Sequence, residues 1–275
     1  MAANSVPDRR LSERVLVIRG AGEQASGIAC RLYRANFRRI LMLETAFPLA
    51  VRRLVSFCEA VHEREMTVEG VAAVRADRVE DVATIWNAGS IAVLVDPEAA
   101  SLAQLQPDLL LDATLAKRNL GTSLAHAPLV IGLGPGFTAG VDCHLVLETN
   151  RGHDLGRVIG SGAAEPDTGI PGAIGGYTRE RVLRAPVAGR FESDRVIGDP
   201  VLKGESIGRI GEVEVRAAID GVLRGMIRPG ALVKAGLKIG DVDPRGRKEY
   251  CATVSEKARA LGGGVLEALL ACYNR

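Results

Sequence analysis

The sequence contains few features of disulfide frameworks, membrane spans or nucleic-acid surfaces. Its five cysteines include no C-x-x-C pair, which fits reduced thiols in a cytosolic protein. No stretch approaches the roughly 20 apolar residues of a membrane-spanning helix, and residues 1–14 lack the apolar core of a signal peptide. The net charge is only +2, and the arginine pairs are scattered without interleaved aromatic residues. We therefore expect a cytoplasmic protein with neither a membrane nor a nucleic-acid partner.

Catalytic and metal-binding signatures are also scarce. The chain has four histidines, and it shows no Ser-His-Asp pattern, no Walker-type lysine and no paired carboxylates. Asp142 and His144 flank Cys143, but no C-x-x-C or H-x-x-x-H spacing supports a metal site, so none is expected. His144 and His153 remain as candidates for a general acid. The sequence therefore shows no particular reaction.

Among the features that are present, a glycine-rich turn between an apolar strand and a helix is the best marked. Residues 15–18 are apolar, and apolar residues then recur at helical spacing from Ala25 to Ala35. Two glycines one residue apart allow a tight turn and let a phosphate approach the helix N-terminus. The turn residues expected to bind a ligand are Gly20, Ala21, Gly22, Glu23, Gln24 and Ala25. The motif predicts a nucleotide site, although a turn that only packs would look similar.

Glu44 completes this pattern, because it ends a second apolar run, residues 40–43. An acid about 20 positions beyond the glycines accepts hydrogen bonds from a ribose diol. The same carboxylate repels a 2′-phosphate, which favours NAD or another adenosine-type nucleotide over NADP. The alternative is that Glu44 is simply a solvated strand end.

Further apolar runs at 91–95, 109–111 and 129–131 alternate with helical patterns. They predict a Rossmann-like, mostly parallel, doubly wound sheet, whose ligands bind at the carboxyl ends of the strands. The glycines of the loop at 132–140 could form an anion-binding nest. Lys117 and Arg118 could bind a phosphate, or they could lie at the solvated start of a surface helix. The candidate residues from these loops are Thr114, Lys117, Arg118, Gly132, Gly134, Gly136, Asp142, Asn150 and Arg151.

Residues 185–242 contain an internal repeat at an offset of 32 residues, from Ala185 and Ala217 to Ile210 and Val242. Short strands separated by glycine turns, twice over, predict a duplicated β-sandwich. The pattern resembles the barrel-sandwich hybrid of biotinyl and lipoyl carrier domains. Because the hairpin at 211–216 has no lysine, no biotin or lipoate attachment is expected.

These patterns divide the chain into four parts. Residues 1–13 form an N-terminal arm, and residues 14–176 form the Rossmann-like α/β domain with a glycine-rich loop at its end. Residues 177–247 form the all-β barrel-sandwich hybrid domain of two 32-residue repeats. Residues 248–275 form a C-terminal helix, interrupted by three consecutive glycines, that packs on the body.

Nearly the whole chain resembles a family of bacterial accessory proteins. The segments that carry the resemblance are 18–22, 133–142, 148–159, 168–172 and 221–225. They are similar to YqeB-type maturation proteins of selenium-dependent molybdenum hydroxylases, which are distantly related to the XdhC/CoxI proteins. The resemblance implies an accessory role in maturing a molybdenum hydroxylase, with a hydroxylase subunit as partner. It also implies handling of the molybdopterin cofactor. Our hypothesis is that the turn at residues 20–25 binds a nucleotide or the phosphate of that cofactor, and that Asp142, Asn150, Arg151 and His153 complete the pocket.

Two other functions remain open at this point. An NAD-dependent oxidoreductase would use His144 or His153 as its general acid. A non-enzymatic scaffold would use the duplicated C-terminal domain to dock a hydroxylase subunit. The sequence does not decide whether the chain is an enzyme, and it leaves a homo-oligomer open.

Overall fold

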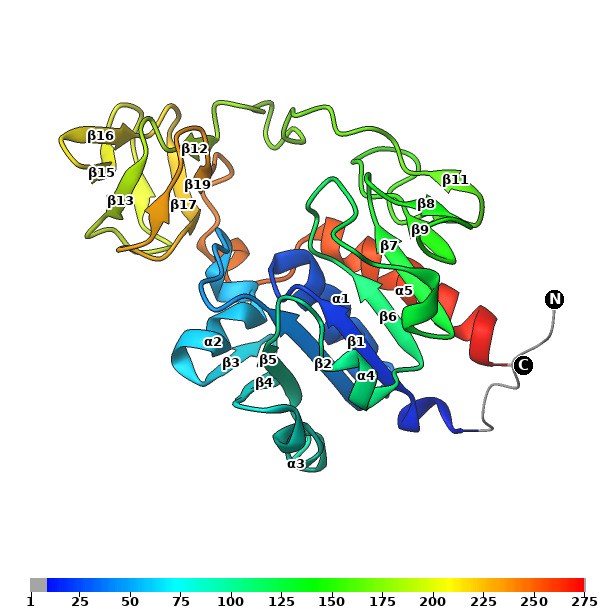
Figure 1. Ribbon diagram of the computed structural model, residues 1–275. Helices are drawn as coiled ribbons and strands as arrows, with labels where there is room; N and C mark the ends of the chain where they lie inside the picture. The colour runs from blue at the N-terminus through cyan, green and yellow to red at the C-terminus, as the bar shows by residue number, and fades with distance from the viewer. Residues whose placement is uncertain (1–8, 275) are drawn as a thin grey trace.

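The computed structural model describes residues 9–274 and is built around one large sheet (Figure 1). Its nine strands run in the order β10-β9-β7-β6-β1-β2-β5-β4-β3. The seven inner strands pair in parallel, whereas β3 and β10 are antiparallel to their neighbours at the two edges. The strands are β1 Val15–Arg19, β2 Arg39–Glu44, β3 Glu65–Val68, β4 Val71–Ala76, β5 Ile91–Val95, β6 Leu109–Asp112, β7 Leu129–Leu133, β9 Leu145–Leu147 and β10 Val158–Ile159.

The centre of this sheet is buried on both faces. All five residues of β1 are buried, and Val17 pairs with Leu41 on one side and Leu110 on the other. Such continuous apolar runs are typical of parallel strands with both faces covered. Two separate clusters of buried apolar side chains, one containing Leu16 and one containing Val17, fill the two faces.

One face is covered by the two long helices, α1 (Glu23–Arg34) and α5 (Glu256–Tyr273), which lie side by side (Figure 1). A Cβ atom on Gly27 would lie 2.6 Å from the Cβ of Ala258, so the glycine allows this close contact. Helix α5 continues through Gly262–Gly264, which corrects the expected interruption. A Cβ atom on Gly262 would lie 3.0 Å from Arg31 of α1, and one on Gly264 would meet the backbone of Gly156, so the helix packs closely at these two positions. The other helices are short: α2 Ala60–Glu63, α3 Val82–Asn87 and α4 Leu102–Leu105.

The C-terminal strands form two four-stranded antiparallel sheets, ordered β12-β19-β17-β14 and β16-β15-β13-β18. Strands that begin 32 residues apart, such as β13 at Gly189 and β17 at Gly221, occupy equivalent positions in the two sheets. Their apolar side chains form a third buried cluster. The strands are β12 Val182–Arg184, β13 Gly189–Glu192, β14 Pro200–Val201, β15 Ser206–Ile210, β16 Val213–Arg216, β17 Gly221–Met226, β18 Leu232–Val233 and β19 Lys238–Asp243.

An irregular connection links these sheets to the rest of the chain. It follows a small ribbon formed by β8 (Thr138–Ala139) and β11 (Gly162–Ala163), and Figure 1 shows it crossing to β12. Strand β17 meets the large-sheet unit directly. A Cβ atom on Gly225 would lie 2.7 Å from the carbonyl oxygen of Val51. Within residues 9–274, no helix is long and apolar enough to cross a bilayer.

The expected fold class, a Rossmann-like domain beside a lipoyl- or biotinyl-type barrel-sandwich hybrid, is wrong. The large sheet is mixed, with antiparallel strands at both edges, and three of its helices have only four to six residues. The C-terminal segment pairs as two separate four-stranded sheets. Apolar runs and glycine turns indicate where strands occur, but strand pairing is decided by contacts distant in the sequence.

Candidate ligand-binding site

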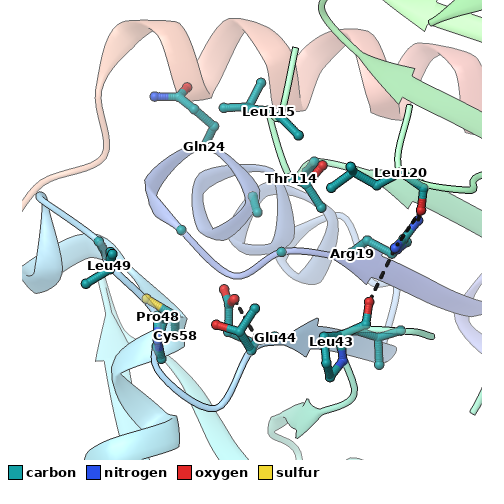
Figure 2. Close-up of a pocket in the computed structure, with 18 of the residues that line it drawn as sticks. Arg19, Gln24, Leu43, Glu44, Pro48, Leu49, Cys58, Thr114, Leu115 and Leu120 are labelled. Carbon is teal, nitrogen blue, oxygen red and sulfur yellow. Dashed lines mark hydrogen bonds between the residues drawn. The ribbon is translucent and has the colours of Figure 1, made fainter. Parts of the chain in front are cut away.

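A cavity of about 900 Å³ opens at the carboxyl ends of β1, β2, β5 and β6 (Figure 2). The strands bring together loops that are far apart in the sequence, because the carboxyl ends of parallel strands share one edge of the sheet. Seven of the expected ligand-binding residues line this cavity: Gly20, Gly22, Glu23, Gln24, Ala25, Glu44 and Thr114. Ala21 is fully buried beneath the same turn.

The glycine turn has the conformation that its sequence requires. Gly20 adopts a φ of +93°, and its N–H donates to the carbonyl oxygen of Leu43 at 2.7 Å. A Cβ atom on Gly20 would lie 3.1 Å from the carbonyl oxygen of Ala113, so a side chain would be strained there. Gly22 is the N-cap of α1 and provides no side-chain cap. Within residues 9–274, no hydrogen-bond acceptor meets the N–H groups of residues 23–25.

Glu44 joins the end of β2 to this turn. Its Oε2 accepts a hydrogen bond from the Ala21 N–H at 2.9 Å, and its Oε1 accepts one from the Thr45 N–H at 2.8 Å. The carboxylate is half-buried at the cavity wall, so each oxygen keeps a lone pair for a further donor. Glu44 can therefore bind a hydroxyl group while it holds the turn.

A buried network beside the turn escaped the sequence interpretation. The Arg19 guanidinium donates to Thr122 Oγ1 at 2.8 Å, to Asp112 Oδ2 at 3.3 Å and to the carbonyl oxygen of Pro97 at 3.3 Å. Asp112 also accepts from Thr122 Oγ1 at 2.6 Å. Arg19 thus ties the loops after β5 and β6 to β1 and fixes the cavity wall. The clue in the sequence is an arginine at the end of an otherwise apolar strand.

The cavity wall carries more acidic than basic side chains. The acidic side chains are Glu23, Glu44, Asp96 and Glu98, and the basic ones are Arg19 and Lys257. Asp96 accepts hydrogen bonds from the N–H groups of Ala100 and Ser101, at 3.0 and 2.8 Å, so both oxygens of its carboxylate already have a donor. The rim is apolar, and Phe47 is 83% exposed there. Figure 2 places Pro48, Leu49, Leu115 and Leu120 around the same opening.

Lys257, in the first turn of α5, is the second feature that the sequence interpretation missed. Burial lowers the pKa of its ammonium group, and Arg151 lowers it further. Lys257 also lines a second cavity of about 450 Å³ with Asn150 and Arg151. Its position depends on α5 packing beside α1, which no local pattern indicates.

Asn150 and Arg151 therefore lie in this second cavity and are absent from the wall of the first. The Asn150 amide donates to Glu165, and Arg151 forms an ion pair with Glu256. Burial and then the nearby Arg181 and Arg224 lower the pKa of Arg151. A side chain on Gly172 would collide with Arg151, so this loop closes tightly over the guanidinium.

The glycines at the end of β7 and in the loop that follows it allow close packing. A Cβ atom on Gly132 would meet the ring of Phe137, and one on Gly134 would meet Thr149. On Gly136 it would lie 2.5 Å from the backbone nitrogen of Arg118. None of these three glycines lines either cavity described above.

The remaining charged candidates from these loops also lie outside the two cavities. Lys117 forms an ion pair with Asp167, and the Arg118 side chain is exposed. Asp142 accepts from the Thr138 N–H at 2.8 Å and from the Asn119 amide at 3.0 Å, so it holds a turn. The structure therefore does not bring these residues together with the glycine turn.

Neither candidate general acid reaches the first cavity. His144 Nδ1 accepts from the Val130 N–H at 3.0 Å, near the amino end of β7 and thus at the opposite edge of the sheet. Burial lowers its pKa. His153 is exposed in the loop before β10. Within residues 9–274, no group of three or more His, Cys, Asp or Glu side chains could hold a metal ion.

Comparison with known proteins identifies one strong sequence relative. The chain is 50% identical to "Uncharacterized protein YqeB" from Escherichia coli K12 over 264 residues, which are 96% of this chain and 49% of that protein. This chain is therefore similar to YqeB over almost its whole length. It spans about half the length of the curated relative that it matches. No protein-family model matches the chain.

Similarity to solved structures is much weaker than this relationship to YqeB. An aspartoacylase family protein from Mesorhizobium loti is 12% identical, with a TM-score of 0.26, over 76% of this chain and 57% of that one. TcdA (CsdL) is 13% identical, with a TM-score of 0.36, over 96% and 90%. A succinylglutamate desuccinylase/aspartoacylase from Rhodobacter sphaeroides is 16% identical, with a TM-score of 0.26, over 83% and 85%. With TM-scores this low, these similarities assign to the chain neither of the two expected folds nor an activity.

Proposed function

We propose that this chain binds a nucleotide or a molybdopterin-type cofactor in the cavity beside the glycine turn. The proposal rests on one observation, which is that three binding features lie together at the opening of this cavity. The uncapped first turn of α1 offers N–H groups to an anion, Glu44 offers acceptors to hydroxyl groups, and Phe47 offers an exposed aromatic face. A ligand with a phosphate, neighbouring hydroxyls and a planar ring matches all three.

The charges of the wall favour some members of this class over others. Glu23 and Glu44 flank the turn, so a second phosphate near Glu44 would be repelled. The burial of Glu23 raises its pKa, but Arg52, the Ser255 hydroxyl and further cations together more than offset that effect, so its pKa lies below the usual value. Glu23 is therefore a carboxylate at neutral pH. We expect AMP-like or NAD-like ligands to bind better than NADP.

The biological role that we propose is maturation of a molybdenum hydroxylase. It is supported by the resemblance to YqeB-type maturation proteins and by the relationship to YqeB over most of this chain. Dependence on selenium and a hydroxylase subunit as partner belong to the same proposal, as does the distant relationship to XdhC/CoxI proteins. The C-terminal sheets are the part that we propose to dock such a subunit.

The positions of the two histidines give no support to the alternative function, an NAD-dependent oxidoreductase with His144 or His153 as its general acid. That enzyme needs a proton donor within hydrogen-bond reach of its substrate. His144 lies at the opposite edge of the sheet and His153 lies in an exposed loop. Neither histidine is among the residues that line the cavity.

Isothermal titration of the purified chain with AMP, NAD, NADP, CTP and molybdopterin tests the proposal. We expect saturable binding of an adenosine nucleotide or of molybdopterin, with NADP weaker than NAD. Phe47→Ala should weaken binding roughly tenfold, since stacking contributes about 1–3 kcal/mol per base. Leu54→Ala is the matched control, because Leu54 is an exposed apolar residue outside the cavity.

Native mass spectrometry of protein purified from a strain that makes molybdopterin supplies an independent result. A co-purifying cofactor mass that is lost with Phe47→Ala would support the proposal. If none of the five ligands binds and no cofactor mass appears, the binding proposal is wrong. The alternative of a non-enzymatic scaffold is then the favoured function.

A further inference from the structure

The second cavity is walled by three segments that are distant in the sequence. One is the loop after β9 with Asn150 and Arg151, another is the irregular connection from residue 165 to residue 178, and the third is the first turn of α5 with Lys257. Its volume of about 450 Å³ lies in the range of about 300–1,000 Å³ that is typical of small-molecule sites. The proposed function uses the first cavity, so the second one has an occupant still to be assigned.

The connection is held in place over this cavity by its own contacts. The buried Arg181 donates from Nε and Nη2 to the carbonyl oxygen of Gly172, at 3.2 and 3.0 Å, and forms an ion pair with Asp241 of β19. A Cβ atom on Gly172 would collide with the Arg151 side chain, so the connection packs directly on that residue. The cavity therefore has a fixed wall on this side.

Two cations in the wall have hydrogen-bond donors that no acceptor uses. Arg151 donates from Nη1 to the exposed Glu256, and its Nε and Nη2 donate to no acceptor within residues 9–274. The Lys257 ammonium group forms no hydrogen bond or ion pair with any of these residues. The two cations lie close together, because they line one cavity and Glu256, the partner of Arg151, directly precedes Lys257 in the chain.

The carboxylates around Lys257 already have other donors. Glu23 and Asp167 each form an ion pair with a different cation. Glu148 accepts two backbone hydrogen bonds, at 2.6 and 2.7 Å. Lys257 is therefore available to an anionic group that enters the cavity.

One carboxylate in the same wall has no cation beside it. Glu165 Oε2 accepts a hydrogen bond from the neutral amide of Asn150, and Oε1 accepts none from the part of the chain that the structure describes. No lysine, arginine or histidine among residues 9–274 forms an ion pair with Glu165. The wall therefore combines unused cationic donors with an anionic acceptor.

We propose that the second cavity binds a small zwitterion, a free α-amino acid, with its carboxylate on Arg151 and Lys257 and its ammonium group on Glu165. An arginine matches a planar carboxylate through two parallel hydrogen bonds, and a lysine adds a third. A simple anion such as acetate or phosphate would leave Glu165 unpaired and would be repelled by it. The site is separate from that of the proposed function, although Lys257 lines both cavities.

Thermal-shift screening of the full chain with each standard L-amino acid, followed by titration calorimetry of those that raise the melting temperature, tests this site. We expect saturable binding of at least one amino acid. Its des-amino analogue keeps only the carboxylate, and its amide keeps only the ammonium group. Each should bind at least about tenfold more weakly, because each loses hydrogen bonds to a charged partner.

Two variants assign the two ends of the ligand. Glu165→Gln should weaken binding of the amino acid about tenfold and leave the des-amino analogue unchanged, whereas Lys257→Gln should weaken binding of both. Glu267→Gln and Lys234→Gln are the matched controls, because both residues are exposed and lie outside the cavity. Melting curves confirm that each variant is folded.

Two results would overturn this site. One is that no amino acid binds, and the other is that Glu165→Gln changes the affinities for the amino acid and its des-amino analogue by the same factor. Amino-acid binding by a chain that binds no nucleotide or molybdopterin overturns only the proposed function, because Glu165 lines the second cavity and not the first.

Discussion

The carboxylate of Glu44 holds the backbone of Ala21 at 2.9 Å and so couples the end of β2 to the glycine turn. A hydrogen bond with a charged partner contributes about 1.5–3 kcal/mol, against about 1 kcal/mol for a neutral one. Because this carboxylate is also the group that would meet a ribose, turn stability and ligand choice depend on the same side chain.

The first prediction concerns Glu44→Gln. The amide can still accept from Ala21 but loses the negative charge, so we expect a loss of about 1–2 kcal/mol in the free energy of unfolding. Without the repelling charge, the affinity for NADP should rise relative to NAD by roughly tenfold. Urea denaturation and calorimetry measure the two effects. Glu267→Gln, an exposed site on α5, should change neither. An unchanged NADP-to-NAD ratio would show that Glu44 does not face the ribose.

The second prediction separates backbone strain from close packing in the loop after β7. Gly136 and Gly140 both have positive φ, +106° and +85°, but only a Cβ on Gly136 meets another backbone, that of Arg118. Gly140→Ala should destabilise the protein by about 1–2 kcal/mol through its φ alone. Gly136→Ala should cost about 1–3 kcal/mol more. Equal losses in urea denaturation would contradict the close approach.

The third prediction is a pH dependence of stability. The folded-state pKa of Lys257 is lowered, so between that value and about 10.4 the unfolded chain binds more protons. The groups facing Lys257 are Arg151, Glu23, Glu148 and Asp167. Stability should therefore rise with pH across this window in the wild type, and less so in Lys257→Met. Denaturation at pH 7 and pH 9.5 measures the difference, with Lys234→Met as the control. A parallel pH dependence in wild type and Lys257→Met would be inconsistent with a desolvated ammonium.

The fourth prediction concerns the five free cysteines. Burial raises the pKa of Cys30 to about 12 and of Cys143 to about 11, and also raises that of Cys58 and Cys251. Cys272 is the partly exposed one. Alkylation of the native protein at pH 8, followed by peptide mass spectrometry, should modify Cys272 alone. Cys272→Ser should then abolish labelling, and labelling of Cys58 would mean that its thiol is accessible from the cavity.

The sequence alone determined the local parts of this protein. The apolar runs of β1, β2 and β6, the turn at Gly20–Gly22 and the place of Glu44 at the end of β2 follow from side-chain patterns over a few tens of residues. The 32-residue repeat likewise matches two sheets with equivalent strand orders. Seven of the residues expected to bind a ligand meet at one cavity for this reason, because parallel strands bring their carboxyl ends together.

Only the tertiary structure decided which distant side chains complete the site. The antiparallel edge strands, the buried network of Arg19 and the placement of Lys257 in the same cavity wall as Glu23 all depend on packing between elements distant in the sequence. The sequence suggested His144 as a general acid, but His144 lies just before β9 and therefore at the edge of the sheet opposite the cavity. Local patterns specify strands and turns, whereas burial and charge pairing arise only when the elements meet.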